Sequence, residues 1–438
     1  MAFQQFEVEF TKSGDVFNAA QVNALLQAVG GLTDLFVISH GWNNDAAEAR
    51  SLYDNLFKSV VEVMDAGVVK GLDGRTFGVM RILWPSKKFA DEDLIPGGGA
   101  ASATHENDTA LLKLLEDLKS DPKRLGGHDK SAVRQKALSA AQALVPHLEN
   151  DAAARQKYVF LLRSILSPED AHVEDGSEEF FSREPQELFD GLAGAVNAPG
   201  GRGIGGATSV GHAGGAAGLK DLVSGVKAAA RRLANFATYY AMKERAGIVG
   251  RTGVAQVLHR VRDRKSDVRL HLIGHSFGGR LVTSAANALA ANTPAVTISL
   301  LQAAYSHNGL AKDFDKENHD GAFRAVMSEK RVSGPIIITH TKNDKAVGIA
   351  YPLASRIARD QASAMGDEKD PYGGMGRNGA QATPEAQGVA GDLLAVGKSY
   401  AFVAGKVFNL KADAFISNHS DVTGQQVAYA VLNAVKTI

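Results

Sequence analysis

Short apolar runs that alternate with helical patterns are the dominant feature of the chain. Four clear runs predict buried strands, and they occupy residues 35–39, 78–83, 268–273 and 335–339. Two weaker runs, at residues 296–301 and 406–411, follow the same pattern. Strands separated by helices predict an α/β fold with a mostly parallel sheet that helices cover on both faces. Ligands of such sheets bind beyond the carboxyl ends of the strands, so we expect the chemistry there.

Residues 86–250 lack this alternation and predict a large, mainly helical insertion. Apolar residues recur at helical spacing in residues 132–148 and 219–240, and a run rich in glycine lies at residues 200–218. The insertion would form a fixed cap or a mobile lid over the core. We favour the fixed cap, because no helix in it combines a strongly apolar face with basic flanks, as a membrane-surface helix does.

The insertion divides the chain into three parts. Residues 1–85 and 251–438 are the two parts of the core, and residues 86–250 are the cap with its glycine-rich segment. A second loose stretch at residues 365–391 is rich in Gly, Ala, Gln and charge, which predicts a long surface loop that borders the pocket.

Composition narrows the classes of function. Lys plus Arg and Asp plus Glu both number 48, so we expect no nucleic-acid partner. The absence of cysteine excludes disulfides, thiolate zinc sites and cysteine nucleophiles. We expect no integral membrane segment, because no apolar run approaches about 18 residues. Without a basic and apolar leader the default location is the cytoplasm, with export without a cleavable signal left open.

The segment Gly274-His275-Ser276-Phe277-Gly278 carries the most specific signal. It follows a predicted strand and precedes a predicted helix, which is the context of a G-x-S-x-G nucleophile turn. The serine of such a turn adopts a strained backbone, and the glycines two positions before and after it avoid clashes. We therefore predict that Ser276 is a nucleophile.

A serine nucleophile needs a carboxylate and a histidine, which in this motif follow it in that chain order. Asp344 lies just past the strand at residues 335–339 and is the predicted acid. The other acids after the serine lie in a very polar stretch that predicts a solvated loop, and they are Asp313, Asp315, Glu317 and Asp320.

His419 is the predicted base, since it follows the last strand and precedes a final amphipathic helix that Ser420 or Asp421 would cap. His340 precedes the acid and breaks the expected order, while His307 and His319 are expected at the surface. The remaining histidines are too scattered to predict a metal site, and they include His40, His105, His128, His147 and His172. We expect neither metal nor cofactor.

The oxyanion hole needs two N–H donors. Phe277 follows the nucleophile and supplies the first, and Trp42 in the loop His40-Gly41-Trp42-Asn43 supplies the second. Gly41 would let the backbone approach the substrate, and Asn43 could assist.

With these residues assigned, residues 33–85 and 250–438 resemble the α/β-hydrolase superfamily. His40-Gly41-Trp42 resembles the oxyanion loop of lipases and esterases, and His40-Gly41-Trp42-Asn43 with Asn418-His419-Ser420-Asp421 is similar to poorly characterised bacterial members. The resemblance implies hydrolysis of a carboxylic ester, either a small molecule or a lipid. An amidase or peptidase with the same triad and a non-catalytic binding module are the alternatives.

Overall fold

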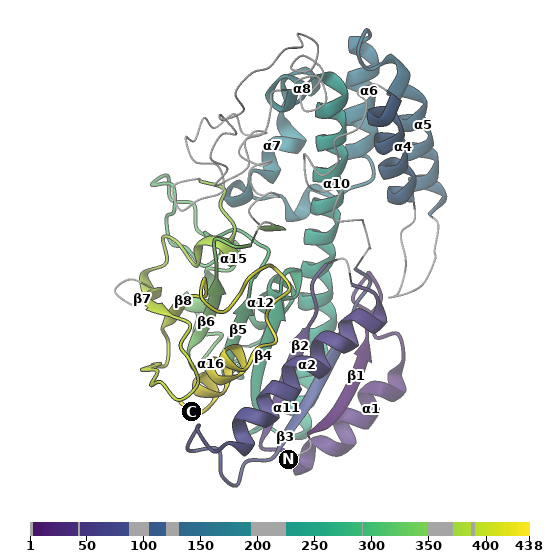
Figure 1. The fold of residues 1–438 in the computed structure, drawn as a ribbon. Helices are drawn as coiled ribbons and strands as arrows, with labels where there is room; N and C mark the ends of the chain where they lie inside the picture. The colour runs from purple at the N-terminus through teal and green to yellow at the C-terminus, as the bar shows by residue number, and fades with distance from the viewer. Residues whose placement is uncertain are drawn as a thin grey trace, which may run out of the picture.

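A single sheet of eight parallel strands forms the centre of the molecule (Figure 1). The computed structural model describes residues 3–42, 44–86, 105–119, 131–193, 225–290, 292–344, 346–347, 371–386 and 390–438. In spatial order the strands are β1 (Gln4–Glu9), β3 (Phe77–Leu83), β2 (Asp34–Ser39), β4 (Arg269–His275), β5 (Thr297–Leu301), β6 (Ile336–His340), β8 (Val407–Lys411) and β7 (Ala390–Asp392). The sheet confirms the predicted α/β class, and the six predicted strands occur within two residues of their expected ends.

The two strands that the sequence did not predict are the edges of the sheet. Strand β1 has the sequence Gln-Gln-Phe-Glu-Val-Glu, and its first four residues are exposed or half-buried, so it has no continuous apolar run. Strand β7 has only three residues. Edge strands bury less surface than central ones, and their sequence signal is correspondingly weak.

Helices cover both faces of the sheet, because successive side chains of each strand point to opposite faces. Val37 and Leu272 belong to a core shared with α1 (Ala19–Ala28), α10 (Val226–Ile248), α11 (Ala255–Arg264) and α12 (Phe277–Ala288). Their neighbours Phe36 and Ile273 belong to a second core on the other face, with α2 (Ala46–Asp65) and α16 (Gln425–Val435).

A further group of helices gathers around the first half of α10, above the sheet in Figure 1. They share a third hydrophobic core and comprise α4 (His105–Lys119), α5 (Ala132–Leu144), α6 (Ala152–Arg163), α7 (Ser177–Ser182) and α8 (Pro185–Ala193). The predicted helix at residues 132–148 is therefore α5 followed by the 3₁₀ turn Val145–His147. The glycine-rich run and residues 219–224 lie outside the described residues.

Helix α10 connects this helical region to the sheet. It runs eight residues past the predicted end at residue 240 and continues through the π-helical segment Val249–Val254 into α11. A Cβ atom at Gly250 would lie 2.2 Å from the carbonyl oxygen of Leu281 in α12, and one at Gly253 would lie 2.4 Å from that of Gly14. Glycine at these positions lets the continuous helix pack directly against neighbouring backbone.

The described part of residues 365–391, which the sequence predicts to be a long surface loop, is partly buried. Helix α15 (Met375–Asn378) lies within it, and Met375 is fully buried. The backbone of Gly376 is hydrogen-bonded to the residues that follow β5 and β6: its carbonyl oxygen accepts from Thr341 N at 3.0 Å and from Gln302 Nε2 at 3.0 Å. The surface-loop prediction was wrong there, because polar composition does not reveal a segment that packs beside β5 and β6.

Among the described residues, no helix combines the length and the apolarity that crossing a membrane requires.

Candidate active site

The direction in which successive strands are added to the sheet changes between β2 and β4. Strand β2 continues to β3 on one side, and β4 continues to β5 on the other, while β2 and β4 pair directly, with Ser39 opposite Gly274. The helices that follow them, α2 and α12, lie on opposite faces of the sheet. Such a switch point opens a crevice at the carboxyl ends of the two strands, which is where parallel α/β sheets bind ligands.

Ser276 occupies the turn between β4 and α12 at this switch point. Its backbone has φ 56° and ψ −126°, a left-handed region that non-glycine residues rarely adopt. A Cβ atom at Gly274 would lie 2.3 Å from the carbonyl oxygen of Gly278, and one at Gly278 would lie 2.3 Å from that of Ser39. Both glycines are therefore required by close backbone contacts, as the sequence pattern predicts.

The backbone around Ser276 is fixed on both sides. Ser276 N donates to Leu301 O at 3.1 Å, and Ser276 O accepts from Ala304 N at 3.0 Å. The first N–H groups of α12, including that of Phe277, have no partner within the helix and can receive a negative charge.

His419 and Asp344 form a hydrogen-bonded pair. The distance from His419 Nδ1 to Asp344 Oδ2 is 2.7 Å, and Asp344 is fully buried. Asp344 Oδ1 accepts from Val347 N at 2.9 Å, and its Oδ2 also accepts from Gln302 Nε2 at 3.4 Å. Because a carboxylate only accepts hydrogen bonds, Nδ1 is the donor of this contact, which leaves Nε2 as the acceptor nitrogen of a neutral imidazole.

The His419 loop lies against the turn that carries Ser276. His275, the residue before Ser276, has its ring centroid 5.0 Å from that of His419, and its Nε2 lies 2.9 Å from the carbonyl oxygen of His419. Among the described residues no hydrogen bond joins Ser276 to His419. Such contacts are often long without substrate and tighten in the reacting complex.

The loop after β2 approaches the same serine. A Cβ atom at Gly41 would lie 2.4 Å from Ser276 Cβ and 2.9 Å from Ser276 Oγ, so only glycine leaves room. The ring of the next residue, Trp42, meets the ring of Phe277 edge to face with centroids 5.8 Å apart. The two predicted oxyanion donors thus belong to adjoining segments.

His40 supports this loop from within the core. Its Nε2 accepts from Trp84 N at 3.3 Å, its Nδ1 lies 2.8 Å from Gly41 O, and its backbone N donates to the Tyr53 hydroxyl at 2.8 Å. Burial lowers the pKa of His40 to about 4, so the ring is neutral and holds the loop rather than titrating.

Two residues near the site have no signal in the sequence pattern. Tyr239 of α10 contacts Phe277, with ring centroids 5.3 Å apart, and so brings the helical region to the predicted oxyanion side. Gln302 directly follows β5, is fully buried and has a positive φ of 47°. Its position directly after a strand, like that of Ser276 after β4, is the one feature that could have identified it.

Two expectations about residues near the site are wrong. His307 is 2% exposed rather than at the surface, and burial lowers its pKa to about 4. Neither Ser420 nor Asp421 caps the last helix, because α16 begins after Gly424. Asp421 Oδ2 instead accepts from Ser417 N at 3.0 Å and closes the His419 loop on itself. Asn43 lies outside the described residues.

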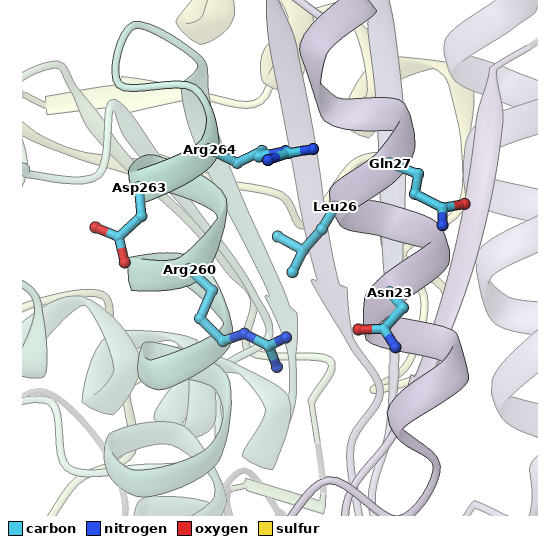
Figure 2. A pocket seen from close by; sticks show the side chains of 6 residues that line it. All are labelled: Asn23, Leu26, Gln27, Arg260, Asp263 and Arg264. Carbon is cyan, nitrogen blue, oxygen red and sulfur yellow. The ribbon is translucent and has the colours of Figure 1, made fainter.

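Two other features lie away from this crevice. Within the described residues, one group could hold a metal ion, namely Asp315, Glu317 and His319, whose ligand atoms lie within 4.8 Å. It is solvent-exposed, and His319 is paired with Asp315. A pocket of about 480 Å³ lies between α1 and α11, where Arg260 and Arg264 extend toward α1 (Figure 2). Because α11 leads into the amino end of β4, this pocket is at the opposite edge of the sheet from Ser276.

Comparisons of the chain with protein-family models, with curated proteins and with solved structures find no match.

Proposed function

We propose that the protein is a serine hydrolase that cleaves carboxylic esters through an acyl-enzyme on Ser276. The observation that carries this proposal is the positive φ of Ser276 at the switch point, together with the hydrogen-bonded pair of His419 and Asp344 in the adjoining loops. A fully buried carboxylate that orients an imidazole beside a strained serine is the arrangement that nucleophilic acyl transfer requires.

The reaction would proceed in two halves. His419 Nε2 takes the proton of Ser276 Oγ while Oγ forms a bond to the ester carbonyl carbon. The N–H groups of Trp42 and Phe277 donate to the oxygen as it gains negative charge. His419 then protonates the leaving alcohol, and water, deprotonated by His419, releases the carboxylic acid and restores Ser276. Asp344 holds the imidazole in the tautomer that both halves need.

The positions of the three residues in the sheet support an α/β-hydrolase assignment. Ser276, Asp344 and His419 follow β4, β6 and β8, in the chain order nucleophile, acid, base. These strands all present their carboxyl ends at one edge because the sheet is parallel. The loop after β2, next to the nucleophile strand, would provide the second oxyanion donor.

A fluorophosphonate probe tests the nucleophile, because it reacts only with an activated serine. We expect the purified protein to be labelled and Ser276→Ala to be unlabelled, with the same circular dichroism and melting temperature. Labelling of the alanine variant, or inert wild-type protein, would refute the proposal.

A panel of matched substrates tests the bond that is cleaved. We expect p-nitrophenyl esters to be hydrolysed and the corresponding p-nitroanilides to be inert within the same assay time. Comparable turnover of the anilides would replace ester hydrolysis by amide hydrolysis with the same residues.

A further inference from the structure

We infer that His275 is a positioning residue that fixes the base His419 through its main-chain carbonyl, an inference that rests on the proposed function. His275 is the last residue of β4 and the immediate neighbour of Ser276. A residue in this place can couple the position of the nucleophile to that of the base.

The contact is direct and buried. His275 is 5% exposed, and its Nε2 lies 2.9 Å from the carbonyl oxygen of His419. The two rings lie 5.0 Å apart with a 42° angle between their planes. Since β4 alternates its side chains, His275 points to the same face as Ile273, the face that α2 and α16 cover, and reaches the loop that precedes α16.

The contact also fixes the state of the ring. A carbonyl oxygen only accepts hydrogen bonds, so His275 Nε2 must carry a proton. His275 Nδ1 is buried without a hydrogen-bond partner in the described structure. A second proton there would be a buried, unpaired charge, and burial accordingly lowers the pKa of His275 to about 3. His275 is therefore a neutral donor at neutral pH.

Two hydrogen bonds hold His419 in this arrangement. Asp344 binds the imidazole at Nδ1, and His275 binds the main chain of the same residue. One anchor alone would let the ring pivot about the Asp344 contact, whereas both together determine where Nε2 points. Misplacement of a reacting group by about 1 Å can cost about 100-fold in rate.

Two variants of His275 test whether the residue acts as a hydrogen-bond donor or only fills space. His275→Gln keeps an N–H donor at similar reach, and His275→Leu removes it. We expect the leucine variant to lose about 10- to 100-fold in kcat with KM within about 2-fold, because His275 does not contact substrate. We expect the glutamine variant to stay within about 3-fold of the wild type.

The matched control is on the same strand. His271 is also buried, but it lies four residues before His275 in β4 and is hydrogen-bonded to Asp34 at 2.9 Å and Thr297 at 3.0 Å. His271→Gln should change the melting temperature and leave kcat unchanged. Equal kcat losses in the folded Gln and Leu variants of His275, or no loss in either, would overturn the positioning role.

A second readout needs no substrate. The His419 Nδ1 proton, bound to Asp344, should give a downfield proton NMR signal that His419→Ala removes. We expect His275→Gln to keep this signal and His275→Leu to broaden or shift it. An unchanged signal in the leucine variant overturns the positioning role, while a wild type that is inert to fluorophosphonate overturns the proposed function alone.

Discussion

At the scale of single residues, the site is built from conformations that only the surrounding structure can maintain. Ser276 and Gln302 both have positive φ, and they follow neighbouring strands, β4 and β5. Backbone strain of this kind costs about 1–3 kcal/mol per residue and persists only where packing and hydrogen bonds hold it. Here Ser276 N bonds Leu301 O across the strand pair, and Gln302 N bonds Thr339 Oγ1 at 3.2 Å.

The role that we propose for Asp344 gives a prediction at this scale. Asp344→Asn should lower kcat on an activated ester by about 10³- to 10⁴-fold, because an amide N–H facing His419 favours the wrong tautomer. Steady-state kinetics with a melting curve of the same sample would measure it. A folded variant with nearly full kcat would show that Asp344 does not orient the base.

At the scale of elements, the continuous helix from α10 through the π-helical segment to α11 sets the distance between the helical region and the sheet. This helix packs tightly against α12 at Gly250, where a Cβ atom would lie 2.2 Å from Leu281 O and 2.9 Å from Ser284 Cβ. π-Helical turns often allow such local fits within a longer helix.

Gly250→Ala should therefore destabilise the protein by about 1–3 kcal/mol, although alanine is intrinsically the better helix former. Gly30→Ala is the control, because a Cβ atom there has no neighbour within 4 Å. Thermal and urea unfolding of both variants would measure the difference. Equal free energies of unfolding for the two variants would mean that the helix at Gly250 can move away from α12 without loss of stability.

At the scale of the whole molecule, a buried group of charges joins the helical region to the core. Asp175 binds Lys243 of α10 at 2.5 Å, and Arg280 of α12 donates from Nε to Lys243 O at 3.1 Å. Glu174 accepts from Ala322 N at 2.8 Å. Breaking a buried charge pair by removing one partner is costly, so this group favours a single arrangement of the two regions.

Glu174 makes this group sensitive to pH. Burial, and then the negative charge of Asp175, raise the pKa of Glu174 from 4.5 to about 7, against the opposing charges of Lys243 and Arg280. The folded protein therefore keeps a proton that the unfolded chain loses above pH 4.5. Stability from this group is complete below about pH 4.5 and is lost as pH rises through about 7.

Glu174→Gln should remove that loss. We expect equal melting temperatures near pH 4.5 and a variant that is more stable than the wild type at pH 8, by at most about 3 kcal/mol. Melting curves of both proteins from pH 4.5 to 8 would test this. Parallel curves would contradict the prediction.

The amino-acid sequence by itself determined the class of fold and the six inner strands, because buried parallel strands are continuous apolar runs with polar ends. It also predicted the turn at Ser276, since Gly274 is required by a local backbone contact with Gly278, although the contact that requires Gly278 is with the distant Ser39. The tertiary structure alone decided which loops meet. Three contacts join positions that are distant in the chain. They are those of His275 with His419, Gln302 with Asp344 and Tyr239 with Phe277, which are 144, 42 and 38 residues apart. The burial of His307 and of Met375 was likewise decided there, because burial depends on what packs over a residue and not on its own polarity.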